Sequence, residues 1–274
     1  MEGLLSYLIP GFLGFIGLAL VWHGLDRMKK HRLIRDIPQS KVRSIAIGIV
    51  EVHGTVKTEA PIKTPFSDSD CVYYRYEIKE YRRHTSRDSK GRTSTTYRWD
   101  TIAFGSRHIP FYAEDDTGQI YVNPALAEFN VDVKKVFYQH AGVFGGITSL
   151  IETLKNWDAN DEQHFDSSNL KLNPYVEKSG FVFRSSKVGD RKYYEYYLEP
   201  GENLFVIGTA ANWDDAPNGI CIQKGENQPA FIISNKTEEV LLKAMKRKMF
   251  AAFFFGIVFV VGGILLFMKF KNML

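Results

Sequence analysis

Residues 71 to 84 have the sequence CVYYRYEIKEYRRH, in which apolar and polar side chains alternate. From Val72 to Lys79, the even-numbered positions place apolar residues on one side of an extended chain, and the odd-numbered positions place mostly polar residues on the other. A strand with one apolar and one wet face is typical of an antiparallel sheet or barrel. This stretch therefore predicts a β-rich body.

The same strand runs into a strongly basic segment, YRRHTSRDSKGRTSTTYRW, at residues 81–99. DSKG is a turn signal between strand-forming residues, so we expect a long hairpin with a projecting tip. Only Glu80 and Asp88 oppose the cations that crowd it, which are Lys79, Arg82, Arg83, Arg87, Lys90, Arg92 and Arg98.

Five of these cations are our candidate binding residues: Arg82, Arg83, Arg87, Lys90 and Arg92. Each could contribute about 1 kcal/mol to contact with anionic lipid headgroups. An acidic protein partner is a second interpretation, and nucleic acid is a third, disfavoured one that predicts steep salt dependence. A solvated hairpin whose charges only prevent edge pairing is a fourth, so the alternatives stay open here.

Two apolar segments bracket the chain, at residues 4–25 and 249–268. The first contains no Asp, Glu, Lys or Arg, and thirteen residues of the second are Leu, Ile, Val or Phe. Each is long enough to cross a hydrocarbon core of about 30 Å as a helix. A cleaved signal peptide carries its positive charge before a shorter apolar run, whereas here the basic residues follow it. A buried core helix is rarely apolar on every face. We therefore expect two membrane-spanning helices.

The orientation follows from the basic residues that flank these segments. Most of them lie on the side of the intervening domain, at residues 27–35 and 243–248. Only Lys269 and Lys271 lie at the other end of the second segment. The positive-inside rule then puts the domain in the cytoplasm and both termini outside, although the length of the loop weakens the rule. The opposite orientation stays open.

The intervening residues, 36–240, predict one membrane-proximal domain of mainly antiparallel strands. We expect a short helix over residues 38–48, a strand at 49–56, an amphipathic helix at 143–157 and paired strands around the turns EPGE and KGEN. Residues 156–173 are polar and are expected to form a mobile excursion. The segments VHGTV (52–56) and VIGTA (206–210) resemble each other, which hints at two related β units in one barrel-like body.

No catalytic or metal-binding motif is found in the sequence. Cys71 and Cys221 are too few for a thiolate zinc site, and we expect both to be buried. The seven histidines are scattered, and His53 and His108 are interpreted as ordinary packed or exposed residues. We therefore expect no cofactor, no metal and no catalytic residue.

The helices themselves suggest close packing. Gly11, Gly14 and Gly17 recur every third residue, and Ala252 with Gly256 forms a pair of small residues four apart. Such positions allow helices to approach closely, within one chain or between the chains of a homo-oligomer.

Two further patterns carry a family resemblance. They are GTVKTEAPIKTPFSDSDCVYYRYEIKEYRR at residues 54–83 and the spacing Glu195-x-x-Leu198-x-x-Gly201-x-x-Leu204-x-x-x-Gly208. With the two flanking helices, the chain resembles the GIDE family of membrane-anchored ubiquitin ligases in its prokaryotic form. The resemblance implies a "beside a membrane" domain between two transmembrane helices, followed in the family by a zinc-binding RING.

The resemblance also raises two conflicts. The sequence ends at Leu274, six residues after the second apolar segment, so we expect no RING and lean against an enzyme, although the family's activity would be ubiquitin-protein transfer. In mitochondrial members the domain lies in the intermembrane space, whereas the charge argument places it in the cytoplasm.

Together these patterns predict an α+β protein in which two transmembrane helices flank a mainly antiparallel, barrel-like domain with one amphipathic helix. We expect a non-catalytic binding or scaffolding domain that contacts headgroups or a protein partner. The alternative is a ligase-like protein that works with a separate RING partner.

Overall fold

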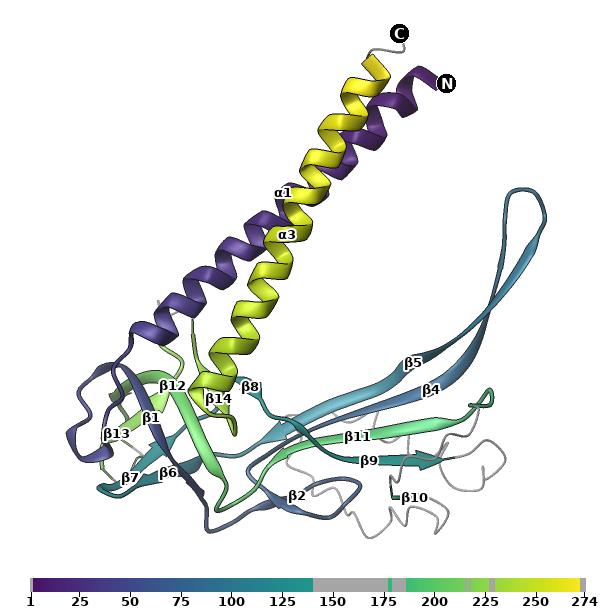
Figure 1. Ribbon diagram of the computed structural model, residues 1–274. Helices are drawn as coiled ribbons and strands as arrows, with labels where there is room; N and C mark the ends of the chain where they lie inside the picture. Colours follow the sequence, from purple (N-terminus) through teal and green to yellow (C-terminus); the bar gives the residue numbers. More distant parts are fainter. Residues whose placement is uncertain are drawn as a thin grey trace.

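The computed structural model describes residues 2–139, 177–178, 186–214, 216, 218–226 and 230–271. Two long helices, α1 (Glu2–Asp36) and α3 (Glu238–Lys271), lie side by side and point away from a β-rich body (Figure 1). Both are long and apolar enough to cross a membrane. At 1.5 Å per residue each measures about 50 Å, which exceeds the hydrocarbon core by several turns. The helices contain the predicted apolar segments and extend past them toward the body.

Glycines allow the two helices to pack closely. A Cβ atom at Gly17 would lie 2.7 Å from Val260 Cγ2, and one at Gly256 would lie 2.8 Å from Val21 Cγ2. The predicted role of Gly17 and Gly256 is thus confirmed within one chain, whereas a Cβ at Gly11 or Gly14 would meet open space. The sides of the pair expose large apolar residues that a soluble protein would bury, such as Trp22, which is 75% exposed.

Five strands of the body close into a barrel. Their order is β1 (Gly48–Lys57), β6 (Phe111–Asp115), β7 (Gly118–Val122), β13 (Ile220–Gln223) and β12 (Asn203–Asn212), and β12 pairs back with β1. Neighbouring strands are antiparallel except β13 and β7. Two short strands, β14 (Ile232–Ser234) and β8 (Glu128–Asn130), extend the sheet from β12.

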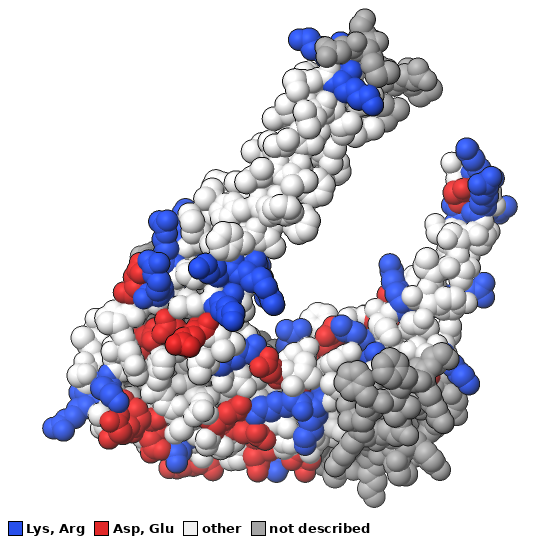
Figure 2. Space-filling view, in the orientation of Figure 1, with Lys and Arg blue, Asp and Glu red and all other residues white. Residues whose placement is uncertain are grey.

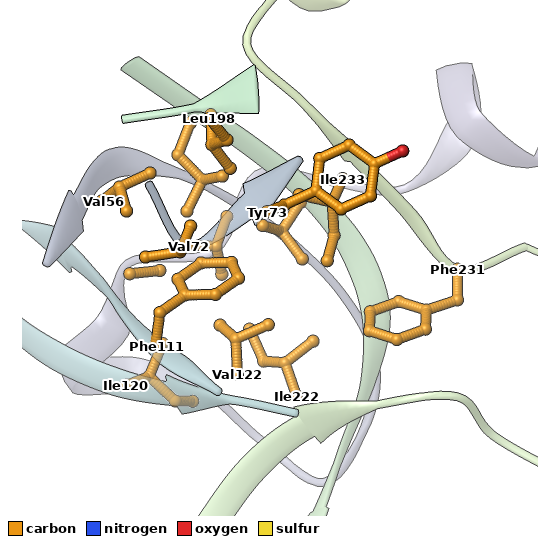
Figure 3. Close-up of a cluster of buried hydrophobic side chains, with 14 of the residues drawn as sticks. Val56, Val72, Tyr73, Phe111, Ile120, Val122, Leu198, Ile222, Phe231 and Ile233 are labelled. Atoms are coloured by element: carbon orange, nitrogen blue, oxygen red, sulfur yellow. The ribbon is translucent and has the colours of Figure 1, made fainter. Parts of the chain in front are cut away.

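Alternation along the strands explains the barrel core (Figure 3). Val50, Val52 and Val56 of β1 are buried inside it, as their spacing predicted. Position 54 of the same strand is glycine because a Cβ atom there would come within 2.2 Å of the Glu114 carbonyl oxygen on β6. The two similar segments meet directly in this barrel, where Val52 of β1 pairs with Val206 of β12.

The second sheet has five antiparallel strands. Their order is β10 (Glu177–Lys178), β9 (Val133–Gln139), β11 (Arg191–Leu198), β4 (Tyr73–Arg87) and β5 (Thr93–His108). One face buries Tyr74, Tyr76 and Ile78 of β4, as their alternation predicted, together with Tyr193 of β11. Tyr73 departs from the pattern, because it is buried against the barrel core.

A loop covers this buried face. It carries the short strands β2 (Ile62–Lys63) and β3 (Asp70–Cys71), and its Phe66 ring lies edge-on to Tyr76 and Tyr193. The backbone N–H groups of Phe66 and Ser67 donate to the buried Glu195 carboxylate at 2.6 and 3.2 Å. Glu195, the first residue of the spacing motif, therefore fastens the loop to the sheet.

The α+β architecture with a barrel agrees with the prediction, but some local expectations do not. Instead of a helix over 38–48, one 3-10 turn, η1 (Val42–Ser44), precedes β1. The N–H groups of Val42 and Arg43 donate to the side chains of Asp115 and Thr117, which fixes the segment against the barrel. The amphipathic helix at 143–157 and the excursion at 156–173 lie outside the described residues.

Candidate functional site

The predicted hairpin is present and projects far from the body. The backbone of Tyr81 still bonds with Gly189 and Asp190, and beyond it β4 pairs only with β5 among the described residues. We call the hairpin segment at residues 81–99 the arm. In Figure 1 the arm rises on the same side of the body as the two helices, and Figure 2 shows Lys and Arg side chains at its tip. The arm therefore presents its charge on the side where a membrane would lie.

The structure divides the five predicted cations into two groups. Arg82 donates to Glu80 at 2.8 Å, so its charge is already paired. For Arg83, Arg87, Lys90 and Arg92, the described residues provide no ion pair, although Arg87 Nε donates to the carbonyl of Gly91 at 3.3 Å. Four exposed cations are thus available to an anionic ligand.

Carboxylates concentrate at the root of the arm. Glu80 also accepts from Arg191 at 2.8 Å, and Asp100 accepts from His84 at 2.5 Å and from Arg98 at 3.0 Å. Burial raises the pKa of Glu80, but the hydrogen bonds from Arg82 and Arg191 outweigh it and hold the pKa below its ordinary value. The root is a neutralised network, which leaves the outer part of the arm as the basic part.

The tip is closed by the carboxylate of Asp88. Its Oδ1 accepts the backbone N–H groups of Lys90 and Arg92 at 2.9 and 2.8 Å, and Gly91 supplies the left-handed conformation that the turn needs (φ +79°). Because Asp88 binds backbone donors here, it organises the turn that displays the neighbouring basic side chains.

The face of the second sheet opposite the loop, which no described segment covers, was not predicted as a binding surface. Cations there lie over aromatic rings: Arg75 over Tyr196 at 5.0 Å, Lys79 over Tyr194 at 5.3 Å, and Lys192 over Trp99 at 4.2 Å. Phe104 is 77% exposed beside them. We call this surface the open face; its residues are Arg75, Lys79, Trp99, Phe104, Tyr138, Lys192, Tyr194 and Tyr196.

The open face is turned toward the helix side of the molecule. The loop that carries β2 covers the opposite face, and Figure 1 shows this loop on the side of the sheet away from the helices. Figure 2 also shows Lys and Arg gathered where the helices leave the body. We call this group the collar; it consists of Arg27, Lys29, Lys30, Arg32, Arg35, Lys243, Lys246, Arg247 and Lys248. Arm, open face and collar are three basic regions on one side.

A family model for GIDE, described as E3 Ubiquitin ligase, matches residues 80–267. The chain belongs to the GIDE family. Neither the curated proteins nor the solved structures gave a match. The GIDE match begins at the root of the arm and includes β11, β12 and most of α3, so it covers the arm and most of the open face. The resemblance seen in the sequence is confirmed.

One further group of side chains has the chemistry of a metal site, and it lies partly outside the GIDE match. Ligand atoms of Glu51, His53 and Glu238 all lie within 4.8 Å of one another. No metal was expected from the sequence, and His53 was interpreted as an ordinary packed or exposed residue, because the histidines are scattered. No spacing connects residues 51 and 53 with residue 238. Only the alternation Glu51-x-His53 on one strand face gave any signal.

The two cysteines do not belong to this group. Cys71 and Cys221 are both buried, as predicted. Burial is the main cause that raises the pKa of Cys71 to about 12, and it also raises the pKa of Cys221. Such thiols react slowly, because the thiolate is the reactive form.

Proposed function

We propose that the protein is a membrane-anchored, non-catalytic binding module whose arm and open face contact anionic lipid headgroups. In this proposal α1 and α3 cross the bilayer through residues 4–25 and 249–268, and residues 36–240 form the membrane-proximal domain. The observation that carries it is the position of the arm tip on the same side as the helices and the collar, with four arm cations for which the described residues provide no ion pair.

The energetics favour lipid as the ligand. Both ends of the domain are attached to the helices, so the arm is already held near the bilayer at high effective concentration. Four cations near an anionic surface contribute about 1 kcal/mol each. Tyr, Trp and Phe on the open face suit the interface, where amphipathic rings are favoured. The basic residues on the domain side of both helices favour a cytoplasmic position for this surface under the positive-inside rule.

A fluorescent probe at the tip tests the proposal. Ser89 is exposed, and the S89C variant can be labelled selectively because both native thiols are buried. The labelled full chain is reconstituted in vesicles of phosphatidylcholine, with or without phosphatidylserine, that contain a headgroup spin label. We expect strong quenching that increases with phosphatidylserine. A probe at A60C, on the loop beneath the sheet, should be quenched weakly in both vesicles.

Neighbouring arginines provide a matched control. Arg83→Ser should weaken the tip contact by about fivefold, because one unpaired cation near the surface is lost. Arg82→Ser should change it less, since Arg82 is paired with Glu80. If phosphatidylserine leaves the quenching at position 89 unchanged, headgroup binding by the arm is wrong.

The second candidate function follows from the description of the family as E3 Ubiquitin ligase. In that case the domain would take part in modifier transfer together with a RING protein, and the arm would hold this partner. Affinity capture with the full chain should then recover a zinc-binding RING protein, and Arg83→Ser should reduce its recovery. Recovery that does not depend on the arm would argue against this role for it.

A further inference from the structure

The joint between the barrel and α3 contains a cluster that the lipid-binding surface does not use. Glu51 and His53 alternate on β1 with Val50 and Val52, whose side chains fill the barrel. They therefore face outward from the barrel, where α3 begins with Glu238. One ligand atom from each of Glu51, His53 and Glu238 lies within 4.8 Å of the other two.

Burial distinguishes this cluster from ordinary surface carboxylates. Glu51 is only 2% exposed, and its Oε2 atom is buried without a hydrogen-bond partner among the residues that the structure describes. Its other oxygen, Oε1, lies 2.8 Å from His53 Nε2. A buried carboxylate oxygen without a partner is costly, because the charge loses its hydration.

The second carboxylate increases that cost. Burial, followed by the charge of Glu238, raises the pKa of Glu51, against the lowering effect of the His53 hydrogen bond. Over the described part of the chain, no Lys or Arg forms an ion pair with Glu51 or Glu238. A divalent cation would neutralise both carboxylates and occupy the open coordination of Oε2.

We propose that Glu51, His53 and Glu238 bind a divalent transition-metal ion of the Zn²⁺ type at the joint between the barrel and the membrane helix. Imidazole nitrogen and carboxylate oxygen are common ligands of Zn²⁺, and three protein ligands leave a fourth position for water. His53 and Glu238 are partly exposed, so water can reach that position. Without a thiolate, the set does not select a soft ion such as Cu⁺.

The geometry requires only small side-chain movements. Ligand atoms about 2.1 Å from a tetrahedral ion lie about 3.4 Å apart. Separations of up to 4.8 Å in the cluster would therefore close, and the 2.8 Å between Glu51 Oε1 and His53 Nε2 would open. On binding, metal–ligand bonds would replace the 2.8 Å hydrogen bond between His53 Nε2 and Glu51 Oε1, and any proton held between these atoms would be released to solvent. The centres of the His53 and Phe205 rings lie 5.1 Å apart with the rings nearly perpendicular, and this contact supports the orientation of His53.

Such an ion would connect a barrel strand to the first turn of a membrane helix. The same joint holds an apolar cluster in which Ile34 of α1 and Leu241 of α3 pack on Phe205 and Ile207 of β12. Apolar contacts alone tolerate sliding, whereas metal ligands fix distances and angles. We therefore expect metal binding to stiffen the joint and set the angle between body and helices.

Zn²⁺ titration of the full chain in detergent, against a competing chromophoric chelator, tests this site. We expect one ion per chain with micromolar or tighter affinity, and at least a tenfold loss of affinity in Glu51→Gln and Glu238→Gln. Glu239→Gln is the matched control, because Glu239 is the next residue of the same helical turn and is exposed. Its affinity should equal that of the wild type.

A second measurement separates metal binding from misfolding. Zn²⁺ should raise the thermal unfolding midpoint of the wild type and of Glu239→Gln, but not that of Glu51→Gln. Without metal, Glu51→Gln should melt no lower than the wild type, since it removes a buried charge that faces another carboxylate. Absence of Zn²⁺ binding to the wild type, or equal binding by Glu51→Gln and Glu239→Gln, would overturn the proposal.

Discussion

The barrel and the second sheet are built from similar strands but use their faces differently. The barrel turns one face inward on a closed apolar core and uses its outer face, at β1 and β12, to hold the ends of both helices. The second sheet buries one face under a loop and leaves the other lined with cations over aromatic rings. In the proposed function, the barrel would form the joint to the helices, and the second sheet with its arm would provide the binding surface.

The two regions are nevertheless one unit. Tyr73 begins β4, Val72 precedes it, and Leu198 ends β11. All three side chains pack in the barrel core (Figure 3). The arm thus connects through β4 to the same core that holds the helices. A ligand on the arm would be mechanically linked to the membrane anchor through a rigid, close-packed path.

The sharpest comparison changes the same residue type in both regions. Phe111→Ala in the barrel core should destabilise the body by about 4 kcal/mol, because it opens a cavity where the side chain is 1% exposed. Phe104→Ala on the open face should cost less than about 0.5 kcal/mol, since that side chain is largely exposed. Denaturant unfolding of the full chain in micelles, followed by circular dichroism, measures both. Equal losses would show that the open face is covered by another part of the protein.

Glu80→Gln tests the root of the arm. Arg191 is nearly buried, so loss of its charged partner should cost about 3 kcal/mol at neutral pH. The pKa of Glu80 is lowered in the folded state, so its stabilisation is complete above the unfolded pKa of about 4.3 and is lost as the pH falls through the folded value. The difference between wild type and variant should therefore shrink below about pH 4.

Glu114→Gln on the barrel surface is the control for this variant. Its partner Lys57 is 49% exposed, and exposed ion pairs contribute about 0 to 1 kcal/mol. A loss in Glu80→Gln no larger than in Glu114→Gln would mean that the root network adds nothing beyond a surface pair.

The sequence predicted those features that follow from local periodicity. Alternation in residues 71–84 and the DSKG turn were sufficient for the hairpin, and continuous apolarity was sufficient for the helices. The neutralised root was missed because it depends on register. The pairing shifts between Ile78 and Lys79, and this irregularity brings Asp100 opposite Glu80. A charge count along the chain cannot contain that information.

Long-range pairing explains the other omissions. The parallel contact between β13 and β7 joins strands about a hundred residues apart, and barrel closure depends on it. The cluster of Glu51, His53 and Glu238 likewise exists only once α3 is seated on β1 and β12. Side chains that meet through tertiary structure leave no spacing in the sequence to recognise.

Lys192→Met addresses the smallest effect, the cations over rings on the open face. Lys192 lies 4.2 Å from the centre of the Trp99 ring and 5.0 Å from that of Tyr138, and Met retains most of its length. The variant should lose about 1 kcal/mol of stability, because each partly exposed contact contributes about 0.5 to 1 kcal/mol. Lys57→Met on the barrel is the control, and it should change stability by less than about 0.5 kcal/mol.

If the open face also touches lipid, only Lys192→Met should reduce the quenching of the probe at position 89 in anionic vesicles. Equal quenching in the two variants would place the binding surface in the arm alone. The cations over aromatic rings would then serve only to stabilise the sheet.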